Sequence, residues 1–431
     1  MSSASTARAV AVIAGTRTPF VRSGTVFRDI SAVELACHAS RELLYRTGVQ
    51  GRLIDEVIFG QVIPSVLVPN VAREVALLPQ FPRTIPAYTL NRACASGGQA
   101  ITNAADQIRL GHADTILAGG VESLSDVPVL HSRRFAQLLV ELSKAKSVGA
   151  RLGILGKLRP RDLIPVTPAI AEPSTGESMG QSAEKMAKDN GIARGAQDEV
   201  ALRSHQRAAA GHDDGRLGAE IAPWFGGRDG GDVLAMDNLV RPETSLEALA
   251  ALRPVFDRVH GSVTAGNSSP LTDAAAVILM AEEKARAEGL VPIVRIRSYA
   301  NAAVDPGWQL LSGPALAVPK ALARAGITLA DCGLVEIHEA FAAQVLSNVQ
   351  AWGSTAWAER LGLPARVGDI DWDRTNVLGG SIAIGHPFGA TGARIVTTLG
   401  HEMQRRGVQF GLISICAQGG MGFAMVLENC A

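Results

Sequence analysis

Cys94 has the surroundings that would make a thiol reactive. It lies in the segment NRACASGG, after a strand-like run and before a helical pattern. A helix N-terminus directs free backbone N–H groups and the positive end of the helix dipole at such a side chain, and both favour thiolate over thiol. Its small neighbours leave room for a substrate. We therefore predict a nucleophile, although a buried, inert cysteine is the usual alternative.

His386 is a second candidate, within the glycine-rich segment GGSIAIGHPFGATG that spans Gly379–Gly392. A histidine in such a segment could act as the general base for a thiol held elsewhere in the fold. The phosphate-binding pattern GxxxxGK[ST] is absent here, which argues against a P-loop. A structural turn with an incidental histidine stays open as an alternative.

Two further side chains could move protons or hold a substrate oxygen. Cys416, in SICAQGGMG, ends an apolar run and opens a tight turn. A thiol with an ordinary pKa near 8.5 can transfer protons, but this segment taken alone fits a buried strand-end cysteine better. His338 lies in EIHEAFA, which is not the zinc-binding pattern HExxH, so we consider it a donor to a substrate carbonyl.

Alternating strands and helices must position these groups. Apolar runs predict strands at Ala9–Ala14, Val57–Phe59, Thr115–Ala118, Ala274–Ala281, Val291–Arg297, Leu334–Ile337, Gly411–Ile415 and Phe423–Leu427. Periodic apolar positions predict helices at Ile101–Ile108, Ser182–Asn190 and Gln197–Gly211. This alternation predicts an α/β fold in which helices flank a sheet.

The chain divides into three parts by its predicted elements and by its content of proline and glycine. Residues 1–121 and 261–431 share the strand–helix alternation, which suggests an internal duplication. Residues 122–260 are richer in proline and glycine and have few clear strands, so we interpret them as an insertion that returns to the first part.

The bulk composition limits the classes of function. Lys+Arg and Asp+Glu both number 41, so no global charge favours nucleic-acid binding. The five cysteines (Cys37, Cys94, Cys332, Cys416 and Cys430) are widely spaced without a CxxC pair, which argues against a disulfide framework or a zinc site. We expect neither a metal nor another resident cofactor. The absence of a signal-peptide pattern and of a long apolar run predicts a cytoplasmic protein.

Together, in this order, the segments resemble those of the thiolase family: CASG, GNSSPLTDAA, HEAF, GHPFGATG and CAQGGMG. The resemblance covers nearly the whole chain, and five motifs in matching order make chance a poor explanation. It implies the thiolase fold, with two duplicated βαβαβαββ halves packed in layers and an inserted helical loop domain. It also implies that coenzyme A is a substrate and not a cofactor.

The resemblance assigns roles to individual residues. Cys94 resembles the nucleophile that takes the acyl group, and His386 resembles the base that activates it. Cys416 resembles the acid and base that serves the acetyl-CoA carbon or the incoming CoA. His338 stands where many thiolases have asparagine, holding the thioester oxygen or an oxyanion-hole water. The backbone N–H groups of Cys94 and Gln418 would form the second oxyanion hole.

Other positions match the substrate contacts of the family, or depart from them. Ser269, Met179 and Phe341 fall where the family contacts the pantetheine and acyl region of CoA. Gln418 replaces a glycine common in thiolases, which keeps a backbone donor but adds a side chain. Ser178 precedes Met179 where some biosynthetic thiolases have histidine, which weakens an acetoacetyl-specific interpretation.

The HEAF motif is similar to the motif of one subgroup of the family. This subgroup comprises the thiolase (β) subunit of the trifunctional fatty-acid β-oxidation complex and bacterial 3-ketoacyl-CoA thiolases. Residues 131–161 agree, because they hold eight Lys/Arg against one acid, interleaved with leucines. Such a segment can lie on an anionic membrane surface or dock a partner. A solvated helical hairpin lining the CoA tunnel is an equal alternative, in which the basic residues suit CoA phosphates.

The expected reaction is cleavage of 3-ketoacyl-CoA with CoA into acetyl-CoA and a shortened acyl-CoA, by ping-pong chemistry in fatty-acid β-oxidation. Two alternatives stay open: an acetyl-CoA C-acetyltransferase acting on acetoacetyl-CoA with the same residues, and a catalytically silent lipid-carrier or scaffold subunit. The implied partners are CoA and acyl-CoA thioesters, a homodimer or homotetramer, and a hydratase/dehydrogenase α subunit.

Overall fold

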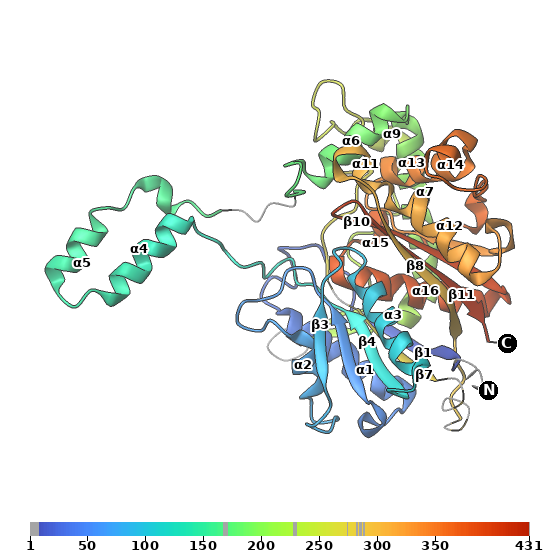
Figure 1. The fold of residues 1–431 in the computed structure, drawn as a ribbon, viewed down its shortest axis with the longest axis horizontal. Coiled ribbons are helices and arrows are strands. Elements are labelled where there is room, and N and C mark those ends of the chain that lie inside the picture. The colour runs from blue at the N-terminus through green and yellow to red at the C-terminus, as the bar shows by residue number, and fades with distance from the viewer. Residues whose placement is uncertain are drawn as a thin grey trace.

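The fold is given by a computed structural model, which describes residues 8–166, 171–226, 231–273, 275–281, 283, 287 and 289–430. Within them a nine-stranded mixed sheet has the order β3-β2-β4-β7-β1-β8-β11-β10-β9 (Figure 1). Its strands are β1 (Val10–Arg17), β2 (Glu56–Gly60), β3 (Ala87–Leu90), β4 (Thr115–Gly120), β7 (Ala275–Ala281), β8 (Val294–Ala303), β9 (Leu334–Ile337), β10 (Phe410–Ala417) and β11 (Met421–Asn429). A separate hairpin pairs β5 (Trp224–Gly226) with β6 (Asp232–Leu234).

The sheet contains the same four-strand pattern twice. In one half β2 is parallel to β4, β4 is antiparallel to β7, and β7 is antiparallel to β1. In the other half β9 is parallel to β10, β10 is antiparallel to β11, and β11 is antiparallel to β8. The halves meet where Ala11 and Val12 of β1 pair with β8. This repetition supports the expected duplication, with β3 added at one edge.

Strand β7 belongs to the first half, although it follows the boundary expected at residue 261. It pairs with β1 on one side and with β4 on the other. We therefore propose that the first half continues to β7 after the insertion. The predicted strands and helices all fall on observed ones; Ala274, the first residue of one predicted strand, lies outside the described residues.

Alternating side chains of the strands bury two faces against helices. On β1, Val10 and Val12 pack in the central cluster, whereas Ala11 and Ile13 pack in an outer one. The central cluster holds α3 (Ser96–Arg109) and α16 (Thr391–Arg406), and the outer one holds α1 (Ala32–Thr47) and α2 (Val71–Ala76). A third cluster packs α12 (Gly313–Ala325) against β11 and β10. The result is a helix–strand–helix–strand–helix layering.

The remaining helices surround this core. They are α4 (Arg133–Lys144), α5 (Val148–Leu155), α6 (Met179–Asp189), α7 (Arg194–Asp213), α8 (Arg216–Glu220), α9 (Leu246–Ala250), α11 (Pro306–Gln309), α13 (Ala342–Gly353), α14 (Thr355–Arg360) and α15 (Ser381–Ile384). Helices α4 and α5 form a hairpin that projects from the body of the molecule (Figure 1). Among the described helices, none is both long and apolar enough to cross a membrane.

A buried ion pair joins the insertion to the first strand. Arg17 of β1 donates to both carboxylate oxygens of Asp237, over 2.6 and 2.9 Å, and both side chains are fully buried. Burial acts to raise the pKa of Asp237, but Arg17 and His212 hold it below its usual value. A buried charge left without its partner is strongly destabilising, so this pair fixes where the insertion returns to the sheet.

Candidate active site

A strained turn between β3 and α3 presents Cys94. Ala93, just before it, has a φ of 45°, which a residue with a side chain rarely adopts. The Asn91 side chain accepts the Ala93 N–H at 2.8 Å. The hydroxyl of Ser96 accepts the Arg92 N–H and donates to the Ala93 carbonyl, both at 2.7 Å. These bonds hold a conformation that aims the sulfur into the fold.

Glycines let the two halves approach closely behind this turn. A Cβ at Gly97 would lie 2.6 Å from the carbonyl oxygen of Gly389, and a Cβ at Gly392 would lie 2.3 Å from the nitrogen of Gly98. Real Cβ atoms do not tolerate such distances, so only glycine permits the contact between α3 and the start of α16. The contact brings the histidine-bearing loop next to Cys94.

The nucleophile and base predicted from the sequence are in direct contact. Nε2 of His386 lies 3.1 Å from the sulfur of Cys94, although the residues are 292 positions apart. Nδ1 of His386 lies 2.7 Å from the hydroxyl of Thr391. If Nδ1 carries the proton and donates it to Thr391, Nε2 has a free lone pair for the thiol proton. Thr391 therefore orients the base, as the third member of such a group does in general.

Burial makes both partners neutral at rest. It raises the pKa of Cys94 to about 12, although the backbone N–H groups of Gln418 and Cys94 act to lower it. Burial, with help from Arg394, lowers the pKa of His386 to about 3. The expected stabilisation of a thiolate by the helix N-terminus is thus outweighed by desolvation. The resting pair is a thiol and a neutral imidazole.

Cys94 and His386 open into an apolar cavity of about 100 Å³. Its wall includes the predicted Cys416, Gln418, Ser269, Met179 and Phe341. Burial and the neighbouring Cys94 raise the pKa of Cys416 well above its usual value, so Cys416 is present as a thiol, able to donate a proton. The structure thus places seven of the predicted side chains around one space, all except His338.

His338 is not among the residues that line this cavity, but one of its ring nitrogens lies within 4.8 Å of the Cys94 sulfur. It is fully buried, and its ring centroid is 4.2 Å from that of His386. Its Nδ1 lies 2.8 Å from the hydroxyl of Ser381, the first residue of α15. Burial lowers the pKa of His338 well below its usual value, and His386 and Arg394 add to this. His338 is therefore a neutral imidazole beside the catalytic pair.

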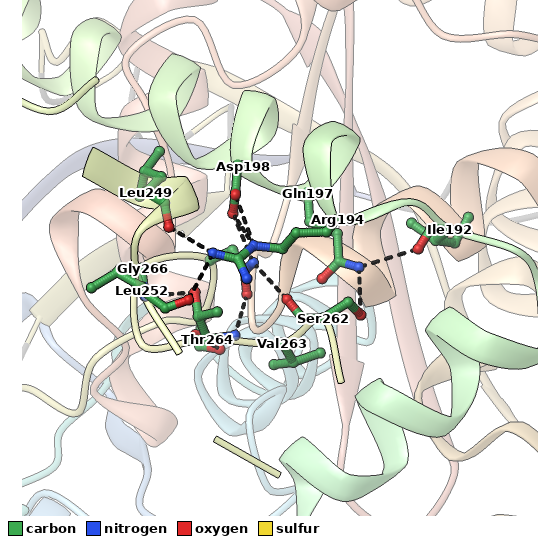
Figure 2. A network of polar contacts seen from close by, with 12 residues as sticks. Ile192, Arg194, Gln197, Asp198, Leu249, Leu252, Ser262, Val263, Thr264 and Gly266 are labelled. Carbon is green, nitrogen blue, oxygen red and sulfur yellow. Dashed lines mark hydrogen bonds and ion pairs between the residues drawn. The ribbon is translucent and has the colours of Figure 1, made fainter. Parts of the chain in front are cut away.

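A polar network holds the segment from Ser262 to Gly266, which leads to Ser269 (Figure 2). Arg194 of α7 bonds Asp198 at 2.7 Å and donates to the carbonyls of Leu249 and Leu252. Gln197 donates to the Ser262 hydroxyl at 2.9 Å. The backbone N–H of Ser269 then donates to the Ala340 carbonyl at 2.9 Å, beside the segment of Phe341. The loop is thus held between α7 and the start of α13.

Ser178 caps helix α6 and thereby positions Met179. The Ser178 hydroxyl accepts the backbone N–H of Gln181, and the Gln181 side chain accepts the Ser178 N–H, which makes a capping box for α6. This cap fixes the first residue of α6, Met179, at the cavity. Serine here therefore has a structural role that the sequence did not indicate.

The side chain of Gln418 is directed at the base of the insertion. Its amide donates to the Ala171 carbonyl at 2.9 Å, and the next residue, Gly419, donates its N–H to Glu172 at 2.9 Å. Both bonds hold the loop whose backbone N–H faces the Cys94 sulfur. The Gln418 side chain thus braces the loop that is predicted to form an oxyanion hole.

Glu122 is a structural member of the site that sequence reasoning missed. Its carboxylate accepts backbone N–H groups from Val62 at 3.0 Å, Ile63 at 2.8 Å and Gly389 at 3.1 Å. It therefore links the end of β2 to the loop of His386. Only its position directly after a strand could have suggested this, because it belongs to no motif.

A second, larger cavity of about 480 Å³ adjoins the first and shares Ser269 and Leu271 with it. Its wall includes Arg22, Arg241 and His205. Two guanidinium groups beside an apolar cavity suit a ligand with a phosphorylated end. Sequence reasoning missed these arginines, because they lie far apart in the chain and outside every motif.

The catalytic cluster also meets a geometric condition for a metal site. The ligand atoms of Cys94, His338 and His386 lie within 4.8 Å of one another. The Cys94–His386 hydrogen bond already engages two of these groups. The expectation that no metal is needed stays a prediction.

Several known proteins resemble the chain along nearly its whole length. Residues 10–284 match the family described as "Thiolase, N-terminal domain", and residues 290–429 match "Thiolase, C-terminal domain". A 3-ketoacyl-CoA thiolase of Aeromonas salmonicida (strain A449) is 48% identical over 425 residues, which cover 97% of this chain and 96% of that protein. A 3-ketoacyl-CoA thiolase of Escherichia coli O157:H7 is 48% identical, with the same coverage.

Solved structures agree. A Bacillus anthracis acetyl-CoA acetyltransferase has a TM-score of 0.83 and 35% identity, covering 98% of this chain and 99% of its own. Human mitochondrial 3-ketoacyl-CoA thiolase has a TM-score of 0.82 and 33% identity with the same coverage. A structure of human mitochondrial 3-ketoacyl-CoA thiolase in complex with CoA gives the same score and identity, covering 98% of each chain. These likenesses confirm the fold predicted from the sequence.

The neutral resting pair can be tested by ultraviolet absorbance, in which a thiolate absorbs more strongly than a thiol. We expect no thiolate signal at neutral pH when the spectrum of Cys94→Ala is subtracted from that of the unaltered protein, because burial raises the pKa of Cys94 to about 12. Cys332→Ala removes a buried cysteine outside the cavity and serves as the control. A thiolate signal specific to Cys94 would show an ion pair instead.

Proposed function

The chain belongs to the thiolase family, and on this premise we propose that it is an acyltransferase that cleaves 3-ketoacyl-CoA with CoA into acetyl-CoA and a shortened acyl-CoA. The observation that carries the proposal is the 3.1 Å contact between Cys94 and His386 in a cavity shared with Cys416. Relatives that are 48% identical over nearly the full length, named 3-ketoacyl-CoA thiolases, support the substrate class.

The first half-reaction uses both thiols. His386 takes the Cys94 proton as the sulfur attacks the keto carbon of the substrate. The bond from that carbon to the acetyl-CoA portion breaks, and its electron pair leaves as the enolate of acetyl-CoA. Cys416 donates its proton to the enolate carbon, acetyl-CoA departs, and the shortened acyl group stays on Cys94 as a thioester.

The second half-reaction restores the enzyme. Incoming CoA gives its thiol proton to the Cys416 thiolate and attacks the acyl carbon on Cys94. The Cys94 sulfur leaves and recovers its proton from His386. Cys416 thus acts first as an acid and then as a base. This suits a group whose thiol form is stabilised by burial.

Two sets of donors serve two different oxygens. The N–H groups of Cys94 and Gln418 face the sulfur, so they suit the oxygen of the tetrahedral intermediate on Cys94. His338, beside His386, suits the thioester oxygen of the leaving enolate. Removal of one oxyanion donor typically costs about 3–4 kcal/mol of transition-state stabilisation. Separate sites allow each oxygen to be stabilised in its own step.

The two adjoining cavities suit the two ends of CoA. Ser269 and Leu271 line both, so a ligand can run from the reacting cysteines into the larger cavity. Arg22 and Arg241 lie there, where the phosphates of CoA would need cations. We propose that Arg241 binds the phosphorylated end of CoA while Met179 and Phe341 contact the thioester end.

We also propose a homodimer formed through β3. This strand lies at the edge of the sheet, and within the described residues only β2 pairs with it. The nearby Val66 and Leu67 are 79% and 87% exposed. An uncovered edge strand beside exposed apolar side chains is a usual site of association. Sedimentation equilibrium should give twice the 45.1 kDa chain mass, and a monomer at micromolar concentration would exclude this pairing.

The projecting α4–α5 hairpin suits an anionic lipid surface. Leu139, Val140, Val148 and Leu152 are between 47% and 73% exposed, and the surrounding residues 131–161 hold eight Lys/Arg against one acid. Arg134 is bonded to Asp162 and donates to the Lys157 carbonyl at 2.6 Å, so the hairpin is held together at its base. Apolar and basic side chains together favour a membrane with negatively charged lipids.

The roles of the two catalytic cysteines can be separated by substitution. Cys94→Ala should lower thiolysis by at least about 10⁴-fold and prevent acylation, because it removes the nucleophile. Cys416→Ala should still accept an acyl group on Cys94, slowly, but lose the carbon–carbon step. Acylation is followed by mass spectrometry and thiolysis by 3-ketoacyl-CoA consumption.

Cys332→Ala is the matched control and should keep full activity, since Cys332 is buried outside the cavity. Full turnover by Cys94→Ala would refute the proposed function. Thiolysis should be measured over a series of acyl chain lengths, because activity confined to acetoacetyl-CoA would favour the acetyltransferase alternative.

The CoA-phosphate site predicts a selective change in binding. Arg241→Ala should raise KM for CoA about tenfold or more, as expected for loss of a charged hydrogen bond, with kcat within about twofold. Lys320→Ala removes an exposed cation outside both cavities and should leave KM unchanged. An unchanged KM for CoA in the Arg241 variant would show that the phosphates of CoA bind elsewhere.

The hairpin proposal predicts binding to vesicles that contain phosphatidylglycerol and not to pure phosphatidylcholine vesicles. The double variant Leu139→Glu and Leu152→Glu should weaken cosedimentation at least about tenfold, since each buried leucine contributes about 1.5–3 kcal/mol. Leu110→Glu alters a leucine that is 69% exposed, at the end of α3 and away from the hairpin, and is the control. Failure to bind anionic vesicles would contradict the proposal, and a hydratase/dehydrogenase subunit would then be the partner to test on the hairpin.

A further inference from the structure

A buried hydrogen-bond chain ends at His338. Nη2 of Arg394, on α16, donates to the hydroxyl oxygen of Ser381 at 3.2 Å. The same hydroxyl lies 2.8 Å from Nδ1 of His338. Ser381 and His338 are fully buried and Arg394 is 1% exposed, so water does not compete for these bonds. None of the sequence motifs gave Ser381 or Arg394 a role.

The donors and acceptors in this chain fix where the protons lie. A guanidinium has only donors, so Arg394 must use a lone pair of Ser381. The one hydroxyl proton of Ser381 is then free to be donated to Nδ1 of His338. If Nδ1 were the donor instead, the Ser381 proton would be left without an acceptor among the described contacts, at the cost of a buried unsatisfied group.

We propose that Ser381, oriented by Arg394, is a positioning residue that holds His338 in the neutral tautomer with its proton on Nε2. In this tautomer His338 is a hydrogen-bond donor toward the oxygen of the acetyl-CoA enolate. The inference rests on the proposed function, because it assigns the His338 donor to one step of that reaction.

The position of His338 makes such a choice of tautomer necessary. Among the described residues, no hydrogen-bond partner reaches its Nε2, which is fully buried next to the catalytic pair. An Nε2 without a proton would present a lone pair to a developing negative oxygen and repel it. Burial keeps the ring neutral, so the proton cannot be on both nitrogens.

The residue type gives an independent reason. An amide side chain at the position of His338 would always offer N–H donors. An imidazole offers a donor on a given nitrogen in only one of its two neutral tautomers. A histidine in this place therefore needs a neighbour that selects the tautomer, and Ser381 is in contact with the required nitrogen.

Ser381→Ala tests the proposal through two reactions of the same enzyme. Thiolysis of 3-ketoacyl-CoA needs the enolate, and we expect its kcat to fall about 10- to 100-fold with KM within about twofold, less than the loss of a whole donor. Exchange of an acetyl group between acetyl-CoA and labelled CoA uses only the donors of Cys94 and Gln418. We expect this exchange to stay within about twofold.

A double-mutant cycle shows whether Ser381 acts through His338. In a His338→Ala background, Ser381→Ala should have almost no further effect on kcat. Ser298→Ala is the matched control, since Ser298 is a buried serine on β8 that donates only to the Ala321 carbonyl, at 2.7 Å. Equal kcat in Ser381→Ala and the unaltered enzyme, an equal loss in the exchange reaction, or an undiminished effect in the His338→Ala background would each overturn the proposal.

A measurement on the unaltered protein covers the case in which Ser381→Ala does not fold. ¹⁵N shifts of histidine-labelled enzyme, with His338 identified by its absence in His338→Asn, should show a protonated Nε2 and an unprotonated Nδ1. A protonated Nδ1 would overturn the proposal. Lack of thiolysis by the unaltered enzyme, in contrast, would overturn the proposed function, so the two failures are distinguishable.

Discussion

The glycine contact between α3 and the start of α16 is the constraint on which the site depends. Each of the two helices begins at a loop that carries one member of the catalytic pair, and no side chain fits between the backbones at Gly97 and Gly389. Any larger residue there would separate Cys94 from His386. Cys94 follows β3 and His386 follows α15, and this contact brings the two loops together into one site.

The burial of the site also determines the protonation states of its groups. Desolvation stabilises the neutral form of every group in the cluster, so it raises the pKa of each thiol and lowers the pKa of each imidazole. A nucleophile that is a thiolate at rest would be easily alkylated or oxidised. In the proposed reaction the thiolate forms only as His386 takes the proton, with the substrate already at the sulfur.

The sequence predicted the residues that lie in motifs, because strand, turn and glycine patterns are local signals. Cys94, His386 and Cys416 could be found in this way, and so could most strands. The place of β7 in the first half could not, since pairing across the insertion leaves no local signal. Glu122 and Arg241 lie outside every motif, and Ser381, although it lies inside the glycine-rich motif, showed no signal of its own role. Their roles come from partners that are distant in sequence, and burial of the site, which decides the state of Cys94, is a property of the whole fold.

The proposed reaction needs opposite tautomers of the two adjacent imidazoles in this site. His386 must have a free lone pair on Nε2 to accept the Cys94 proton, so its Nδ1 must donate, and Thr391 accepts there at 2.7 Å. His338 must offer a proton on Nε2, so its Nδ1 must accept, and Ser381 donates there at 2.8 Å. Both partners are hydroxyls, which can donate or accept. The difference lies in Arg394, which occupies a lone pair of Ser381 and so directs its proton to His338. One buried guanidinium thereby makes one imidazole a donor while its neighbour stays a base.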